Sequence, residues 1–389
     1  MMLYLYFALA LLPQEAPKPD QSKVDQAIKD GVRFLKNRLP EFQSRKNPEG
    51  RDMRVDELVL WTFLHAGVPE TDDAFKTLFD RVLAAKEEVT YRVALKAMIL
   101  EELDRVKYQS WIARCAQFLA DNQCEDGQWS YGNPSIAVDD IPTPSRKDVP
   151  TGTSSDPIVD RKKPKVQRKI GIKARRKGPR TGDNSNSQYA ALGIRACADA
   201  GIVFDRDLLQ RALKSWSDSQ QKDGGWAYAG RRAGPGPGPG PEHDSYGSMS
   251  AGGVGGLIIY LNLLGQNAKS DRRVGTGMKW LEKNFSVQEN PKKGPQWFYY
   301  YLYALERAGV FAGTEKIGTH CWYFEGAQVL LKKQQEDGSW GQRPPRGPQG
   351  GNRPAAHGDP IADTCFAILF LRRAARPFED VATGDHKRR

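Results

Sequence analysis

The chain has 389 residues, of which 39% are hydrophobic, and a formal net charge of +11. A soluble protein of this length can bury one large core or two ordinary ones. Its five cysteines, an odd number, argue against a dense disulfide framework. Residues 161–180 contain 11 lysines and arginines and no acidic residue. Because 11 minus 11 leaves the remainder formally neutral, the folded part requires no polyanion, and we expect no specific nucleic acid partner.

The N-terminus opens with an uncharged apolar run, residues 2–12, followed by the Pro-rich residues 13–19. Eleven apolar residues are too few to span a bilayer, but they match the core of a secretory signal. The sequence therefore predicts a signal peptide and leader over residues 1–19. We expect an exported protein, periplasmic or extracellular, that is not transmembrane.

Helices are predicted in pairs along the rest of the chain, because apolar residues recur at spacings of three and four. Residues 23–39 pair with 54–66, and residues 73–86 pair with 90–103. Three further predicted helices each run into the same short turn, Q-x-x-D-G-x-W, whose Asp-Gly step ends a helix. The turn residues are Gln123, Asp126, Gly127 and Trp129; Gln220, Asp223, Gly224 and Trp226; and Gln334, Asp337, Gly338 and Trp340.

A second, more apolar helix is predicted after each turn, over 187–200, 248–264 and 361–374. Another pair, 271–285 with 296–308, completes six helical hairpins, roughly twelve helices, without an alternating strand pattern. We predict an all-α fold, an (α/α)6 toroid with an inner barrel of parallel helices sheathed by outer helices. An open helical solenoid is the alternative. Residues 20–376 would form this single domain.

Two insertions and a tail interrupt or follow the pattern. Residues 133–182 are rich in Pro, Ser, Lys and Arg and are predicted to form a disordered basic insertion. Residues 230–244 form a Gly/Pro loop that contains GPGPGPGP. Residues 377–389 form a polar C-terminal tail.

The repeated turn resembles the QW motif of the superfamily that contains squalene and oxidosqualene cyclases and protein prenyltransferase β subunits. The segments 297–309 and 361–371 are especially similar to it, and the resemblance covers about residues 23–375. It implies an α/α toroid of a divergent, single-toroid, bacterial-type member. It also implies that the Gln and Trp of each turn are structural, the Gln amide bonding to backbone at a neighbouring helix end.

The catalytic sets of that superfamily are incomplete in this chain. The D-x-D-D acid of the cyclases is absent from the sequence. Cys321 falls on a zinc-ligand position of the prenyltransferases, but Thr319 and Asp363 replace the Asp and His ligands that the resemblance implies. His320 is adjacent to Cys321, and neighbouring helical side chains diverge by about 100°. We therefore expect no metal or cofactor, and a His320 that is hydrogen-bonded at a helix start.

Six parallel inner helices would bring their N-termini to one rim of the barrel. Their positive dipole ends favour polar or anionic groups there, although several of the polar residues also suit helix capping. We expect an apolar or anionic small-molecule ligand in the central cavity, and the sequence leaves a protein partner open. The candidate residues are Arg54, Asp56, Tyr91, Arg92, Asn186, Gln188, Tyr246, Trp297, Tyr300, His320, Cys321 and Asp363.

Three functions remain open at this point. The first is a binding or non-standard member of the superfamily without the catalytic sets. The second is an active terpenoid-processing or isoprenoid-processing enzyme with unfamiliar catalytic residues. The third is a polysaccharide lyase or hydrolase on the same kind of toroid. The sequence does not decide whether the protein is an enzyme.

Overall fold

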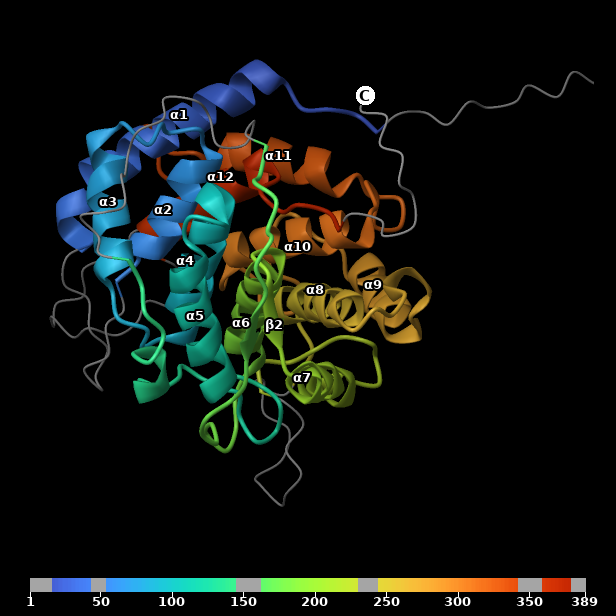
Figure 1. Ribbon diagram of the computed structural model, residues 1–389. Helices are drawn as coiled ribbons and strands as arrows, with labels where there is room; N and C mark the ends of the chain where they lie inside the picture. The colour runs from blue at the N-terminus through green and yellow to red at the C-terminus, as the bar shows by residue number, and fades with distance from the viewer. Residues whose placement is uncertain (1–15, 43–53, 145–161, 230–243, 342–358, 379–389) are drawn as a thin grey trace, which may run out of the picture.

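The computed structural model describes residues 16–42, 54–144, 162–229, 244–341 and 359–378. Within these ranges twelve α-helices alternate along the chain between an outer and an inner layer (Figure 1). The outer helices are α1 (Gln21–Asn37), α3 (Asp73–Ala84), α5 (Gln109–Asp121), α7 (Arg206–Ser219), α9 (Arg272–Lys283) and α11 (Trp322–Lys333). The inner helices are α2 (Asp56–His65), α4 (Thr90–Asp104), α6 (Asn184–Asp199), α8 (Gly247–Leu263), α10 (Phe298–Ala312) and α12 (Pro360–Arg372).

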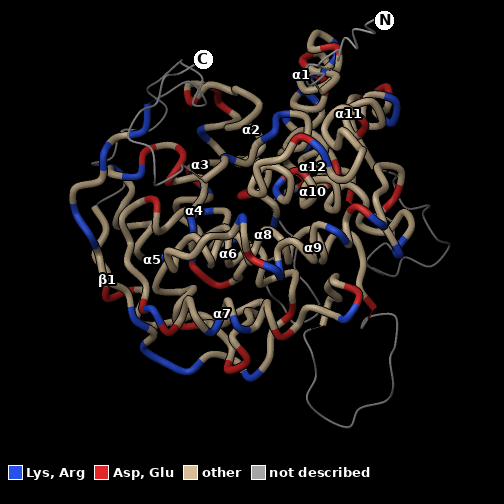
Figure 2. The backbone as a smooth tube through the Cα atoms, turned by 90° about the vertical axis from the view of Figure 1, so that its right-hand side faces the viewer, with Lys and Arg blue, Asp and Glu red and all other residues tan. Residues whose placement is uncertain are grey.

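The inner helices form a closed ring. Each packs against the next inner helix, and α12 packs back against α2, while the outer helices cover the ring (Figure 2). Outer helix α1 buries one stripe that includes Val24, Ile28 and Leu35, as expected for an amphipathic helix. Inner helix α8, by contrast, is buried at every position from Gly247 to Leu261. The predicted all-α toroid is confirmed.

The three Q-x-x-D-G-x-W turns join successive outer helices. In each turn the Gln amide bonds across the turn and also donates to a backbone carbonyl of the next outer helix. Gly127 illustrates why glycine is needed: its φ is +85°, and an added Cβ would lie 2.4 Å from the Arg211 carbonyl oxygen. The amide donations are Gln123 to Leu208 (2.9 Å), Gln220 to Arg273 (2.9 Å) and Gln334 to Ala27 (2.8 Å).

The tryptophan of each turn ties the outer helix to the inner one. The ring of Trp340 is fully buried, and its Nε1 donates to the Leu330 carbonyl of α11 at 2.8 Å. Its backbone N–H donates to Thr364 Oγ1 of α12 at 3.0 Å. Trp129 and Trp226 make the same two kinds of bond. These residues hold the hairpins together, and none of the three tryptophans lines either of the two cavities described below.

The basic insertion differs from the sequence prediction. Residues 133–144 and 162–182, expected to be disordered, pack against α5 and the end of α4. Strand β1 (Ile170–Ile172) pairs in parallel with β2 (Ile202–Phe204). The Gln109 and Gln117 amides donate to the Arg168 and Lys173 carbonyls at 2.8 and 2.9 Å. These backbone contacts, which composition does not reveal, order the segment.

Several sequence predictions fall outside the described residues. They include the apolar run of the predicted signal peptide, most of the Gly/Pro loop, and residues 379–389 of the tail. Among the residues that are described, no helix is both long and apolar enough to cross a membrane.

Candidate ligand-binding cavity

A cavity of about 470 Å³ lies at the end of the barrel where the inner helices begin. It is lined by residues from the first turns of the inner helices and from the loops that precede them. Aromatic side chains are the commonest lining type, and six of them are tyrosines. The lining comprises Arg54, Val55, Glu57, Leu58, Tyr91, Arg92, Leu95, Tyr131, Ser185, Asn186, Tyr189, Tyr228, Tyr246, Ser248, Met249, Trp297, Tyr300, Ala362 and Phe366.

The aromatic rings form two parts of the cavity wall. Deep in the cavity, Tyr189 and Tyr300 stack nearly parallel, with ring centroids 6.3 Å apart and planes 9° apart. Phe366 of α12 adjoins Tyr300 at 5.5 Å between centroids. At the rim, Trp297 is 57% exposed and has the left-handed backbone conformation, with φ of 57°. A bulky residue rarely adopts this conformation, which here directs an exposed indole to the cavity rim.

A buried ion pair occupies one side of the cavity. Arg92 of α4 donates to both carboxylate oxygens of Glu57 of α2, from Nε at 2.9 Å and from Nη2 at 2.8 Å. Both side chains are almost fully buried. A bidentate guanidinium–carboxylate pair of this kind is directional and close to electrically neutral. Glu57 is the only carboxylate among the described residues that line the cavity.

Asn186 presents a hydrogen-bond acceptor beside the cavity. Its Nδ2 donates to Asp183 Oδ2 at 2.9 Å, which fixes the orientation of the amide because a carboxylate only accepts. Its Oδ1 is buried and accepts no hydrogen bond. Asp183 also caps α6 by accepting from the Asn186 N–H at 2.7 Å. Burial raises the pKa of the Asp183 carboxyl, and these hydrogen bonds oppose that rise.

A polar layer closes the barrel beneath the cavity. The Tyr300 hydroxyl accepts from Gln188 Nε2, and Gln188 Oε1 accepts from Arg307 Nη2 at 3.1 Å. The Arg307 guanidinium lies 3.8 Å from the ring centroid of Tyr303. The Tyr303 hydroxyl in turn accepts from Trp61 Nε1 at 3.1 Å. These side chains occupy the barrel axis and separate the cavity from the opposite end.

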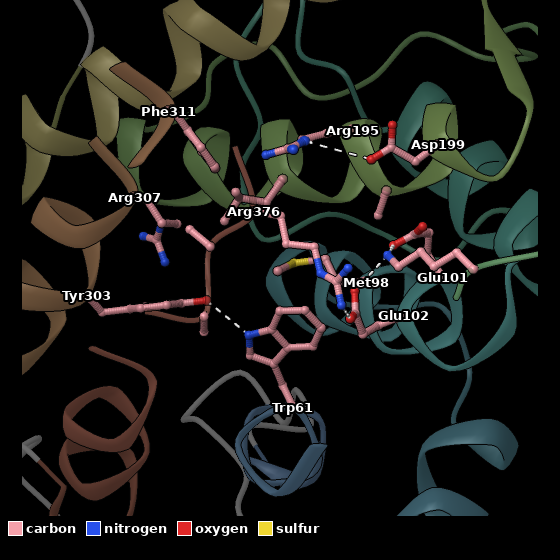
Figure 3. A pocket seen from close by; sticks show the side chains of 15 residues that line it. Trp61, Met98, Glu101, Glu102, Arg195, Asp199, Tyr303, Arg307, Phe311 and Arg376 are labelled. Atoms are coloured by element: carbon pink, nitrogen blue, oxygen red, sulfur yellow. Dashed lines mark hydrogen bonds and ion pairs between the residues drawn. The ribbon is translucent and has the colours of Figure 1, made fainter. Parts of the chain in front are cut away.

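A second, smaller cavity of about 80 Å³ lies at that opposite end, where the inner helices finish (Figure 3). Residues of α10 (Tyr303, Arg307 and Phe311) form one side of it, and Met98 and Glu102 of α4 lie across from them.

The structure brings seven of the candidate residues to the first cavity: Arg54, Tyr91, Arg92, Asn186, Tyr246, Trp297 and Tyr300. The other five candidates do not line it. Gln188 lies beneath it, in the polar layer. Asp56 is buried between Arg54 and Arg81, with 3.7 Å from each guanidinium to a carboxylate oxygen.

The remaining three candidates lie outside the barrel interior or behind its wall. His320 and Cys321 immediately precede outer helix α11, where His320 stacks on Phe285 with centroids 4.2 Å apart. Its Nδ1 lies 3.1 Å from Glu325 Oε2. Asp363 packs beside Gly341, and burial raises the pKa of its carboxyl to about 8. Within the described part of the chain, no group of three His, Cys, Asp or Glu side chains could hold a metal ion.

Sequence reasoning missed several lining residues, including Tyr131, Tyr189, Tyr228 and Phe366. Tyr189 follows Asn186 by three residues on α6, so the helical spacing could have placed it on the same face. Tyr131 and Tyr228 follow Trp129 and Trp226 by two residues, a relation that repeats between two of the turns. That repeat could have predicted that Tyr131 and Tyr228 occupy equivalent positions in the fold.

The fold and cavity define an α/α-toroid protein with a cavity at the N-terminal end of its inner helices. No protein-family model and no curated protein matches the sequence. Among solved structures, the chain is similar to a possible member of the GH105 family from Salmonella enterica serovar Paratyphi A. The TM-score is 0.57 at 11% identity, covering 96% of this chain and 99% of the other.

Two further solved structures are similar to the chain. A possible GH105 member from Klebsiella pneumoniae aligns with a TM-score of 0.55 at 11% identity, over 96% of this chain and 98% of that one. A type II terpene cyclase from Scytonema, in complex with geranylgeranyl dihydroxybenzoate, aligns with a TM-score of 0.49 at 12% identity. That alignment covers 91% of this chain and 97% of the cyclase. The similarity to the two possible GH105 members concerns the helical toroid.

Proposed function

We propose that the protein binds a saccharide, or a similar hydroxylated ring compound, in the cavity at the N-terminal end of the barrel, without cleaving it. The repeated Q-x-x-D-G-x-W turns support placing the chain in the cyclase and prenyltransferase superfamily. The missing D-x-D-D acid and the incomplete zinc-ligand set support a non-catalytic member. The apolar N-terminal run supports export, which would bring the cavity into contact with extracytoplasmic glycans.

The Asn186 amide is the observation that carries the proposal. A buried acceptor without a partner is costly, and a ligand hydroxyl or N–H group would satisfy it. The amide cannot turn to offer its N–H₂ group without breaking the bond to Asp183. A saccharide supplies hydroxyl donors, whereas a hydrocarbon chain supplies none.

The aromatic lining fits the same ligand class. A sugar ring has an apolar face that can lie on an aromatic ring while its hydroxyls reach polar groups at the edges. Trp297 offers an exposed indole face at the rim. Six tyrosines add phenolic hydroxyls to the wall, and a purely hydrocarbon ligand could form no hydrogen bonds with these hydroxyls.

The carboxylates favour binding over turnover. Glycoside hydrolysis generally uses two carboxyl groups on either side of the scissile bond. Glu57 is the only acidic residue among the described residues that line the cavity, and Arg92 engages both of its oxygens. The same feature argues against acid-initiated cyclisation of a terpenoid.

Glycoside cleavage is nevertheless the second candidate, because Asp183 is buried beside the cavity with a raised carboxyl pKa. A general acid needs a raised pKa of this kind. The GH105 structures are compatible with this candidate, since they share the toroid.

Calorimetric titration of the intact protein with a panel of neutral and uronic-acid oligosaccharides tests the proposal. We expect one class to bind and Trp297→Ala to weaken that binding at least tenfold, because the exposed indole is lost while folding is unaffected. His320→Ala, just before outer helix α11 and away from the cavity, is the matched control and should bind like the wild type. Chromatography of the recovered glycan should show unchanged chain length.

Other outcomes would overturn the proposal in specific ways. Shortened glycan products would replace binding with hydrolysis. Binding of a geranylgeranyl compound in place of every glycan, with the same loss in Trp297→Ala, would favour the terpenoid alternative. Equal glycan affinity in the wild type and Trp297→Ala would show that the glycan does not bind in this cavity.

A further inference from the structure

Arg307 is a buried cation without a counter-ion. Its side chain is on α10 near the barrel axis, and the residue is only 4% exposed. Among the described residues, no carboxylate forms an ion pair with it. Buried charges in proteins are ordinarily paired, because an unpaired ion loses its hydration without compensation.

The protein satisfies this guanidinium only in part. Nη2 donates to Gln188 Oε1, and the guanidinium carbon lies over the Tyr303 ring at 3.8 Å. Nη1 is buried and has no hydrogen-bond partner. The adjacent Glu306 does not supply the missing charge at neutral pH, since burial raises the pKa of its carboxyl to about 8. Arg307 therefore retains both an unused donor and an uncompensated positive charge.

The second cavity lies next to Arg307. Its volume of about 80 Å³ exceeds that of a single water site and suits a few waters or one small organic molecule. Beside Arg307, its lining includes the apolar side chains of Trp61, Met98 and Phe311, as Figure 3 shows. An apolar wall with one unpaired cation is complementary to a small molecule with an apolar body and one anionic group.

The acidic residues that line this cavity are already neutralised. Lys163 Nζ lies 2.6 Å from a Glu101 oxygen and 2.7 Å from a Glu102 oxygen. Arg376 also pairs with Glu102. Asp199 lies 3.8 Å from Arg195. These pairs leave Arg307 as the lining cation without an anion, and they place Lys163 and Arg376 over the end of the barrel.

We propose that this second cavity binds a small organic monoanion, a short-chain carboxylate, whose carboxylate pairs with Arg307 and whose alkyl group lies against Trp61, Met98 and Phe311. The site is separate from the saccharide cavity, from which the Gln188 layer divides it. The proposal does not depend on the function assigned to that cavity.

Titration calorimetry with sodium propionate, at constant ionic strength against sodium chloride, tests the proposal. We expect propionate to bind the wild-type protein and to raise its melting temperature progressively as the propionate concentration exceeds the dissociation constant. The Arg307→Met variant should bind propionate at least tenfold more weakly. It should also be no less stable than the wild type in propionate-free buffer, because it removes an uncompensated buried charge.

Arg206→Met is the matched control, since Arg206 is an exposed residue of the outer helix α7. This variant should respond to propionate like the wild type. A propionate response that persists in Arg307→Met, or a wild-type protein that shows no response, would overturn the proposal.

A measurement on the wild-type protein alone keeps the proposal testable if Arg307→Met fails to fold. Crystals soaked in 2-bromopropionate should give an anomalous bromine peak within the second cavity, with the carboxylate at Arg307. Bromine peaks confined to surface lysines would contradict the site. The Trp297→Ala variant separates the two proposals, because it should lose the glycan but retain propionate binding.

Discussion

The side-chain amide of Gln334 donates to the backbone carbonyl of Ala27 at 2.8 Å, although the two residues lie 307 positions apart. This bond joins the last outer helix to the first. The same amide also bonds to Gly338 within its own turn at 3.0 Å. A turn residue therefore contributes to closing the ring of helices. The equivalent residues of the two earlier turns, Gln123 and Gln220, make the same kind of bond to the next outer helix.

Gln334→Ala should destabilise the protein by about 1–2 kcal/mol, because it leaves the Ala27 carbonyl without this donor. Urea unfolding followed by circular dichroism measures the change. Lys332→Ala, an exposed neighbour on α11, is the control and should change stability little. If Gln334→Ala and the wild type have the same urea midpoint of unfolding, the bond from Gln334 to Ala27 does not stabilise the closed ring.

Trp340→Ala should cost about 3–5 kcal/mol, the range for removing a large buried aromatic. The indole is fully buried and bonds to the Leu330 carbonyl. The cavity left behind would lie between α11, α12 and Gly31 of α1, where the ring now packs. Thermal unfolding of the variant is the measurement, and an unchanged melting temperature would refute a structural role for this residue.

Gly127→Ala and Gly265→Ala form a matched pair. Both glycines have positive φ, +85° and +73°, so each alanine should cost about 1–2 kcal/mol in backbone strain. Only at Gly127 would the new Cβ also meet a backbone oxygen, that of Arg211, at 2.4 Å. That collision should add about 1–3 kcal/mol. Chemical denaturation of both variants tests this difference, and equal losses would show that the turn adjusts freely.

The toroid could be predicted from the sequence because its determinants are local and repeated. The Asp-Gly step in each turn has a fixed backbone conformation, and the spacing of apolar residues distinguishes amphipathic outer helices from fully buried inner ones. The position of the cavity rim could be predicted from topology, because parallel inner helices all begin at the same end of the barrel. Seven of the twelve candidate residues line the cavity for that reason.

The remaining features depend on tertiary contacts that no short segment encodes. Arg307 occupies an ordinary helical position, and only the packed barrel shows that its charge is unpaired. His320 and Cys321 were candidates by family position, yet the start of an outer helix places them far from the barrel interior. The basic insertion lacks apolar periodicity. Its backbone is held by the side-chain amides of Gln109 and Gln117, which belong to the outer helix α5.

Arg92→Met should destabilise the protein by about 3–5 kcal/mol, because it leaves the Glu57 carboxylate buried without its partner. The double variant Arg92→Met with Glu57→Gln should recover most of that loss, since no uncompensated charge remains. A double-mutant cycle from urea unfolding measures the coupling. If the stability losses of the two single variants simply add in the double variant, the two side chains are not coupled. The proposed neutralisation of Glu57 by Arg92 would then be wrong.

Glu306→Gln should change the pH dependence of stability in a defined direction. Burial raises the pKa of the Glu306 carboxyl to about 8, against an ordinary value of 4.5. Between these two pH values the folded protein retains a proton that the unfolded chain releases, so this group's contribution to stability falls as pH rises towards 8. Glutamine does not titrate, and its Oε1 can still accept from the Ala375 N–H as Glu306 does now at 2.9 Å. The melting temperature of Glu306→Gln relative to the wild type should therefore increase from pH 5 to pH 8. A constant difference across that range would show that Glu306 ionises normally in the folded protein, and it would then be able to neutralise Arg307.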